Sequence, residues 1–167
     1  AAAVDVMFKA ASVRLTGRHM IGSGWLTIVI DGATADVQTA IDSGRAEATR
    51  HQGEVITAAV VPRADTQTLA SMPHHGAGLA DTGDYEALGI LETKGVVPLF
   101  AGADAMVKAG DVELAGWTFI GGALVHAFVT GSVDDVEAAI TAGEAAARRA
   151  GEFHGALVLS QPEHEMG

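Results

Sequence analysis

Histidine is the residue type in this chain whose chemistry is easiest to judge from spacing. The 167-residue chain contains seven histidines, among them the adjacent pair His74 and His75. Zinc ligands on a helix stand four positions apart so that both face the metal, and this pair has neither that spacing nor a third ligand at a telling interval. We therefore expect no metal site. His126 lies inside an apolar run and is expected to be a hydrogen-bonded core or interface residue.

Two glycine-rich triplets offer a second kind of chemistry. Small residues in a tight connection let the backbone take a positive φ or approach another molecule closely, although a plain hairpin turn is equally compatible with them. A dinucleotide-binding loop would need a third glycine and a following helix, whereas the first triplet precedes a β-favouring run. The sequence thus does not support phosphate binding. The triplets are Gly22, Ser23 and Gly24, and Gly121, Gly122 and Ala123.

Nucleophilic catalysis finds no support in the sequence. The chain has no cysteine, which removes disulfides, thiolate nucleophiles, cysteine-ligated iron–sulfur clusters and cysteine-based zinc sites. No Gly-x-Ser-x-Gly elbow is present, and scattered Ser, His and Asp do not define a catalytic triad. The acidic pair Asp134 and Asp135 is explained by the electrostatics of a helix start. We predict a protein that is not an enzyme and carries no cofactor.

Composition narrows the possible partners. The formal charge of −11 is opposite to that of proteins that bind a phosphate backbone, so we expect no nucleic acid as a partner. No stretch approaches the roughly 20 apolar residues of a membrane-spanning helix, and the start lacks a basic segment followed by an apolar one. We expect a soluble, unexported protein with no membrane partner.

The elements that must position these residues occur twice. Asp5 and Lys9 are matched by Asp104 and Lys108, 99 positions later, and the same offset holds over more than forty residues. After Arg50 the offset falls by one. Such self-similarity at a fixed period indicates two copies of one supersecondary unit. Further matched positions are Ile21 and Ile120, Gly22 and Gly121, Val37 and Val136, Ile41 and Ile140, and Gly44 and Gly143.

Each copy is predicted to contain a helix, two strands, a second helix and a last strand, which makes an α+β fold. Apolar spacing and β-favouring residues predict the borders in the second copy. The first copy has no counterpart of the strand at 87–93. Either the natural chain starts earlier or the strand is absent, and we favour the first because a lost strand leaves an unpaired edge. In the second copy we predict helices at 96–110 and 133–150, and strands at 87–93, 112–119, 124–130 and 153–160. A linker at 64–85 opens with a helical turn around 66–71.

Several runs resemble the bacterial microcompartment (BMC) shell domain. In the second copy the resemblance begins at residues 86–95 and continues to about residue 162. The first copy resembles the same domain from its first helix onward. The runs that carry it are 86–95, 103–109, 112–114 and 120–122 in the second copy, and 21–24 and 60–63 in the first.

The resemblance implies two tandem BMC domains of ferredoxin-like topology in unpermuted strand order, at 1–63 and 86–167, with the linker between them. It implies a structural shell protein that forms a homotrimeric pseudohexamer and packs edge to edge with other shell proteins in the cytoplasm. The two triplets would line a central pore for small metabolites. Lys9, Lys108 and Arg63 would lie at the tile edges. Gly122 and Ala123 differ from their counterparts in the first triplet, so the pore would be only threefold symmetric. Residues 160–161 differ from their counterparts Pro62 and Arg63.

A different class of function remains open from the residues alone. A trimeric α+β regulatory protein would bind a small molecule between its subunits, where many ligand sites lie. Such a sensor would remain a discrete trimer and be stabilised by its ligand. A tile would instead form extended sheets at high concentration. An enzyme with its site at the same kind of interface is the third alternative.

Overall fold

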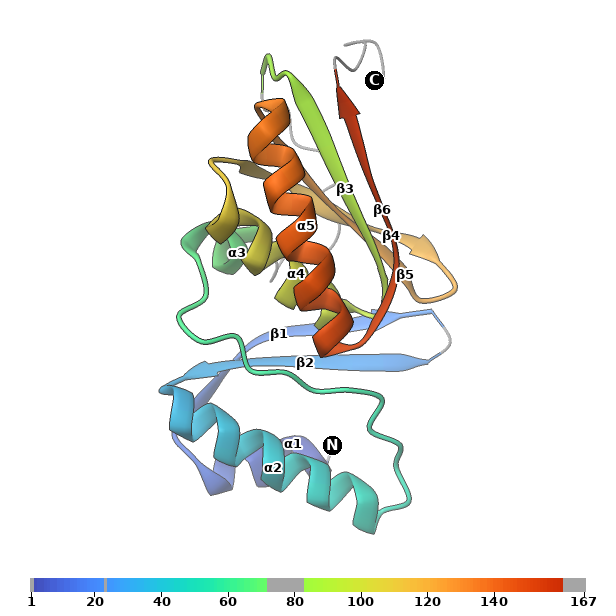
Figure 1. Ribbon diagram of the computed structural model, residues 1–167. Coiled ribbons are helices and arrows are strands. Elements are labelled where there is room, and N and C mark those ends of the chain that lie inside the picture. Colours follow the sequence, from blue (N-terminus) through green and yellow to red (C-terminus); the bar gives the residue numbers. More distant parts are fainter. Residues whose placement is uncertain (1, 23, 72–82, 161–167) are drawn as a thin grey trace.

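The larger unit of the fold is a four-stranded sheet with two long helices on one face. The computed structural model describes residues 2–22, 24–71 and 83–160. The strand order is β4-β5-β3-β6 with every pair antiparallel, the order of a ferredoxin-like βαββαβ unit. Helices α4 and α5 cover one face of this sheet (Figure 1). The elements are β3 (Ala87–Lys94), α4 (Val96–Ala109), β4 (Glu113–Gly121), β5 (Leu124–Gly131), α5 (Val133–Ala150) and β6 (Glu152–Ser160).

Strand alternation explains the core of this unit. Along β5, Val125, Ala127 and Val129 are fully buried, while His126 and Phe128 on the other face are half-buried. Successive side chains of a strand point to opposite faces, so one face of β5 packs beneath the helices and the other stays open. The sheet therefore has one helix-covered face and one open face.

Helix α5 begins and ends as its sequence predicts. The Ser132 side chain accepts a hydrogen bond from the backbone N–H of Asp135 at 3.2 Å and caps the first turn. Acidic residues occupy the first turn and Arg148 and Arg149 the last, which suits the helix dipole. The helix approaches α4 closely because Gly143 faces Met106: a Cβ at Gly143 would lie 2.5 Å from Met106 Cγ.

The smaller unit repeats part of the larger one. It contains α1 (Ala2–Ala10), β1 (Val13–Ile21), β2 (Trp25–Gly32) and α2 (Thr34–Arg50) in the order of α4, β4, β5 and α5. Strands β1 and β2 form a two-stranded antiparallel sheet, with the helices on its far side from the larger unit (Figure 1). The predicted borders of all helices and strands in the second copy agree with the structure within two residues.

One predicted strand is absent. A last strand was expected in the first copy, but residues 54–61, which correspond to β6, run alongside β2 and the lower end of α5 without joining a ladder (Figure 1). The counterpart of this segment, β6, pairs with β3 alone. The first copy has no counterpart of β3 among the described residues, so the segment lacks its pairing partner. An apolar pattern typical of a strand does not by itself produce a strand when no neighbouring strand is available to pair with it.

The linker begins by covering the outer edge of β4. Helix α3 (Thr66–Ser71) follows residue 65 and places Gln67 beside this edge. The Gln67 side chain donates from Nε2 to Val112 O at 3.1 Å and accepts at Oε1 from Leu114 N–H at 2.8 Å. The carboxamide thus forms the two hydrogen bonds that one residue of a neighbouring strand would form. The backbone groups of Val112 and Leu114 at this sheet edge are therefore paired. Within the described residues no helix is long and apolar enough to span a membrane.

Candidate functional site

The two halves of the chain meet through aromatic and apolar side chains. Residues His19 and Ile21 of β1 are buried where the β1–β2 hairpin meets the larger unit. The His19 ring lies edge-on to Trp117, with 5.4 Å between centroids, and 6.4 Å from Phe100. Ile21 belongs to the same hydrophobic cluster as Trp117. The hairpin of the first half therefore contributes directly to the core of the second.

Trp25 extends this contact from the start of β2. The Lys94 ammonium lies 5.6 Å from the Trp25 ring centroid, a cation–π arrangement. Gly95 has φ 91°, and a Cβ there would lie 3.2 Å from the Trp25 ring. Farther along, the Thr57 hydroxyl donates to Ala150 O at 2.6 Å. The open face of the first half thus packs against one end of the second half.

The glycine-rich loops lie next to each other within the chain. A Cβ at Gly22 would lie 3.2 Å from Phe119 Cζ and 3.5 Å from the backbone nitrogens of Gly122 and Ala123. Ser23 lies outside the described residues. The second loop takes positive φ at three successive residues, Gly121, Gly122 and Ala123, and Gly24 in the first loop has φ 78°. The described loop residues carry no ionisable side chain, so they present mainly backbone groups.

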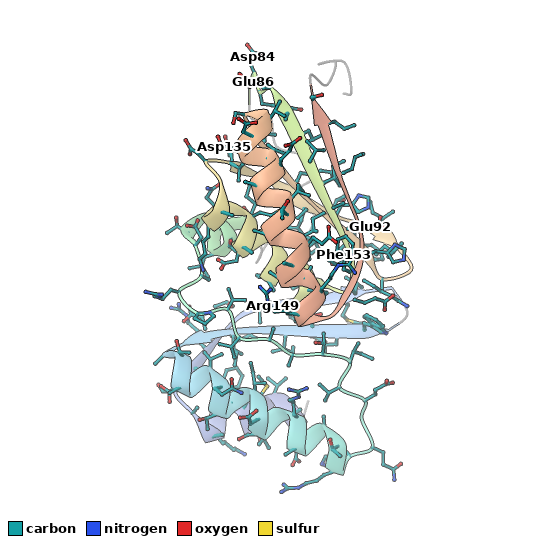
Figure 2. The ribbon with its side chains drawn as sticks, in the orientation of Figure 1. Asp84, Glu86, Glu92, Asp135, Arg149 and Phe153 are labelled. Carbon is teal, nitrogen blue, oxygen red and sulfur yellow. The ribbon has the colours of Figure 1, made fainter. Side chains whose placement is uncertain are left out.

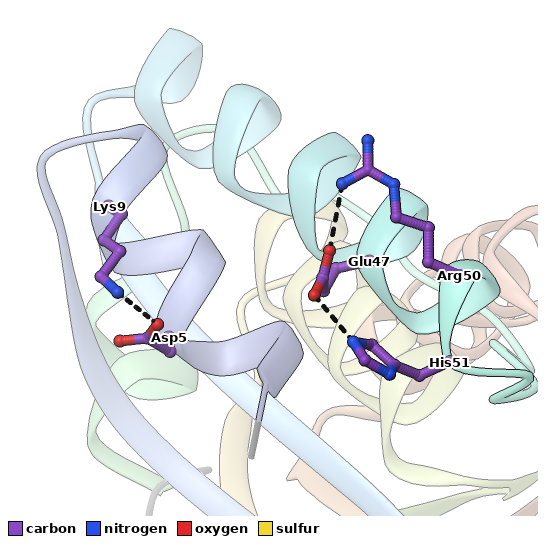
Figure 3. Close-up of polar contacts among 5 residues, drawn as sticks. All are labelled: Asp5, Lys9, Glu47, Arg50 and His51. Carbon is purple, nitrogen blue, oxygen red and sulfur yellow. Dashed lines mark hydrogen bonds and ion pairs between the residues drawn. The ribbon is translucent and has the colours of Figure 1, made fainter.

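Lys9 and Lys108 occupy matching positions and differ in their surroundings. Lys9 Nζ pairs with Asp5 at 2.6 Å, and its side chain is 74% exposed (Figure 3). Lys108 pairs with Asp104 in the same way, but it also donates to Pro62 O at 3.3 Å and its side chain is 41% exposed. Asp104 is buried and accepts a second hydrogen bond at 2.7 Å from the backbone N–H of residue 65. The Lys108 pair therefore holds the linker, whereas the Lys9 pair faces solvent.

Arg63 and Arg50 are exposed basic residues of the first half. Arg63 is exposed, with φ 48°. At the end of α2, Glu47 holds both Arg50 at 3.2 Å and His51 at 3.0 Å (Figure 3). Position 160, the counterpart of Pro62, ends β6, and Gln161 lies outside the described residues.

The open face of the larger sheet carries a three-residue polar cluster. Glu92 on β3 contacts His126 on β5 and His154 on β6, the latter at 2.7 Å from Nδ1. Figure 2 shows Glu92 near the end of the sheet that carries Phe153. The hydrogen bond from His126 holds the pKa of Glu92 below its ordinary value of 4.5, partial burial opposes this shift, and His154 adds to it. The expectation that His126 is hydrogen-bonded is confirmed.

An acidic groove of about 630 Å³ opens at the other end of β3. Asp84 and Glu86 lie at this end in Figure 2, and Asp111 and Glu113 complete the acidic lining. Across the described ranges, no group of three or more His, Asp or Glu side chains is placed to hold a metal ion. His74 and His75 lie outside those ranges.

Sequence reasoning missed the residues that join the two halves. Nothing in the spacing of His19, Trp25, Phe100 or Trp117 indicates that they meet, because they belong to different copies of the repeat. Asp104 was also missed, since its counterpart Asp5 has the same helical position and is exposed. The recurrence of Asp four residues before each lysine was the one available signal.

The chain is similar in sequence to proteins of bacterial microcompartments. The BMC domain model matches residues 1–64 and 87–162. The carboxysome assembly protein CcmO of Synechocystis sp. is 35% identical over 164 residues, covering 93% of this chain and 54% of that protein. The bacterial microcompartment shell protein EutM of Escherichia coli is 47% identical over 81 residues, covering 48% of this chain and 84% of EutM. The chain thus spans little more than half of CcmO.

A solved structure supports the same relationship. The crystal structure of a microcompartment protein from Desulfitobacterium hafniense DCB superposes with a TM-score of 0.76 at 29% identity, covering 96% of this chain and 87% of the other. The chain belongs to the BMC domain family of bacterial microcompartment shell proteins. These are structural proteins rather than enzymes, and the shell that they form lies in the cytoplasm.

Proposed function

We propose that the chain is a tandem-domain shell tile. Residues 1–63 and 86–167 form two BMC domains in unpermuted order, joined by a linker at 64–85. Three chains make a pseudohexamer around a central pore, which packs edge to edge with other shell proteins. Support comes from the two separate matches to the BMC domain and from a solved chain that aligns with both halves.

The observation that carries the trimer is the contact between the two halves. Counterparts of Ile21 and His19, 99 positions later, are Ile120 and Thr118. Ile21 is 4% exposed in the contact, whereas Ile120 is 54% exposed. A contact in which one unit covers the end of the next is head-to-tail, and its repetition closes into a ring when the rotation allows. Ile120 would then cover the first half of the next chain as Ile21 covers the second half of its own.

The proposed pore is lined by the two glycine-rich triplets. Their adjacency within one chain means that a ring of three chains would bring six such loops around one axis. Backbone groups and the Ser23 hydroxyl would line the opening, so selectivity would depend on diameter and hydrogen bonding rather than a ring of charge. Small polar metabolites would cross, and bulky cofactors would be retained.

The proposed tile edges are unequal. Lys9 and Arg63 are exposed in the first half and available to a neighbouring tile. Lys108 is held by Asp104 and Pro62 O, so its edge contact would be weaker unless the linker moves. The edges of the first and second domains would therefore alternate in strength around the tile.

Electron microscopy combined with solution mass tests this function. A tile predicts hexagonal particles with the mass of three chains that form sheets as concentration rises. Particles without a three-chain ring would contradict the pore and the tile together. A discrete trimer that never forms sheets, alone or with other shell proteins, and is stabilised by a small metabolite would favour the regulatory alternative.

A further inference from the structure

The end of α5 lies beside the start of β2 within the chain. A Cβ at Gly95 would lie 3.2 Å from the Trp25 ring and 4.0 Å from Pro98. A Cβ at Gly151, which follows α5, would lie 3.1 Å from the same proline. Figure 2 shows Arg149 at this end of α5, on the side of the first half. The last turn of α5 therefore lies close to the hairpin of the first half.

A hydrogen bond connects the same end of α5 to the segment after α2. The Thr57 hydroxyl donates to Ala150 O at 2.6 Å. By the repeat, Thr57 corresponds to Gly155 and Ala150 to His51. Gly155 stands opposite Glu92 in the ladder between β3 and β6. In the proposed ring the second half of one chain covers the first half of the next, so Gly155 and Glu92 of one chain would lie beside His51 of the next chain.

The hairpins place the same residues at this contact. Trp25 at the start of β2 corresponds to Leu124 at the start of β5. His126 follows two residues later on β5 and stands opposite Glu92 in the ladder with β3. These residues lie on the open face of the larger sheet, and the matching face of the smaller sheet is the one that packs against the larger unit. Both contacts therefore bring the end of α2 of the next chain to Glu92.

The two surfaces carry opposite charges. The Arg50 side chain is 76% exposed at the end of α2, and its Nη1 lies 3.2 Å from Glu47 (Figure 3). A guanidinium has five N–H donors, so it can bind a second carboxylate while it keeps the first. The Glu92 carboxylate contacts His126 through one oxygen and His154 through the other. Each carboxylate oxygen has two lone pairs, so Glu92 can accept a further donor at either oxygen.

We infer that Arg50 of one chain binds Glu92 of the neighbouring chain in the ring. The inference rests on the proposed trimer and names the polar contact that joins its chains. A hydrogen bond between a guanidinium and a carboxylate is charge-assisted and directional, so it would fix how one chain sits on the next. Within the chain, the two halves meet mainly through aromatic and apolar side chains. Salt should therefore weaken the contact between chains and leave the contact within a chain unchanged.

Sedimentation across a concentration series tests the pair. Arg50→Gln should weaken the association of chains at least tenfold at low salt, because Glu92 would then be covered without its partner. Arg45→Gln is the matched control, since Arg45 is also exposed on α2 but lies more than a turn before its end. Added salt should weaken association of the unaltered chain more than that of the Arg50 variant. Equal association and equal salt dependence in all three proteins would overturn the inference.

Cross-linking locates the two residues. The chain has no cysteine, so Arg50→Cys and Glu92→Cys together introduce a single pair of thiols. A short bismaleimide, added where the double variant sediments as a trimer, should join three chains into one species on a denaturing gel. Either cysteine alone should leave single chains. Single chains from the double variant would overturn the inference, because the two thiols would then not meet between chains.

The tile and the ion pair fail separately. Trimers that form with unchanged strength in Arg50→Gln and do not cross-link would overturn only the ion pair. An unaltered chain that never forms a three-chain ring would contradict the tile itself.

Discussion

Ile21 and Ile120 occupy the same position in the two halves of the chain, yet Ile21 is buried against the second half and Ile120 lies in the open. The same backbone position in equivalent hairpins carries the same residue type, so the difference comes from the neighbour and not from local structure. In the proposed ring, the exposed Ile120 would lie in the matching contact with the next chain.

Ile120→Arg should prevent the ring from closing. A buried guanidinium without a partner is costly, so we expect at least tenfold weaker association between chains, with the fold intact. Sedimentation of the variant across a concentration series checks this. Leu69→Arg is the matched control, because Leu69 is similarly exposed but lies on α3 and not in either glycine-rich loop. Trimers of unchanged strength in the Ile120 variant would place the interface elsewhere.

Asp104→Ala and Asp5→Ala should differ although the two residues are counterparts. Asp104 is buried and bonds both Lys108 and the backbone of residue 65, so its loss should reduce the free energy of unfolding by about 2–3 kcal/mol. Asp5 pairs with Lys9 at the surface, where such pairs contribute less than about 1 kcal/mol. Denaturant unfolding of both variants gives the comparison. Equal losses would mean that the linker contact is unimportant.

Gly143→Ala should weaken the packing of α5 on α4. The added Cβ would lie 2.5 Å from Met106 Cγ and 3.3 Å from Gly102 O, so the helices must separate, at a cost of about 1–3 kcal/mol. Gly155→Ala is the control, because a Cβ at Gly155 would meet no atom within 4 Å. Thermal unfolding should show a lower Tm for the Gly143 variant only. A stabilised Gly143 variant would show that Met106 adapts freely.

Glu92→Gln should destabilise the chain in a pH-dependent way. Because the pKa of Glu92 in the folded chain lies below its ordinary value, its charged form stabilises the fold at neutral pH, and this contribution is lost as pH falls through the folded pKa. The free energy of unfolding, measured from pH 7 to pH 3, should differ between the two proteins at neutral pH and become similar at the acid end. Glu137→Gln, on the exposed side of α5, should show little change. A difference in the free energy of unfolding that does not change with pH would mean that the substitution acts through packing and not through the charge of Glu92.

The sequence by itself determined the repeat and the elements within it. The offset of 99 between Asp5 and Asp104, the hairpin glycines and the capped helix at 133–150 all depend on residues close together in the chain. Local propensity and apolar spacing are encoded over short ranges, which is why these predictions agree with the structure and why the resemblance to the BMC domain was visible.

Only the tertiary structure decided what depends on distant partners. Residues 54–61 have a strand-like pattern, but they form no strand because no counterpart of β3 lies beside them within the described residues. His19 and Trp117 meet because the β1–β2 hairpin packs against the end of the larger unit, and Asp104 is buried because the linker lies over it. Matched positions of the two units thus differ in pairing and burial, because both depend on the surface that each unit meets.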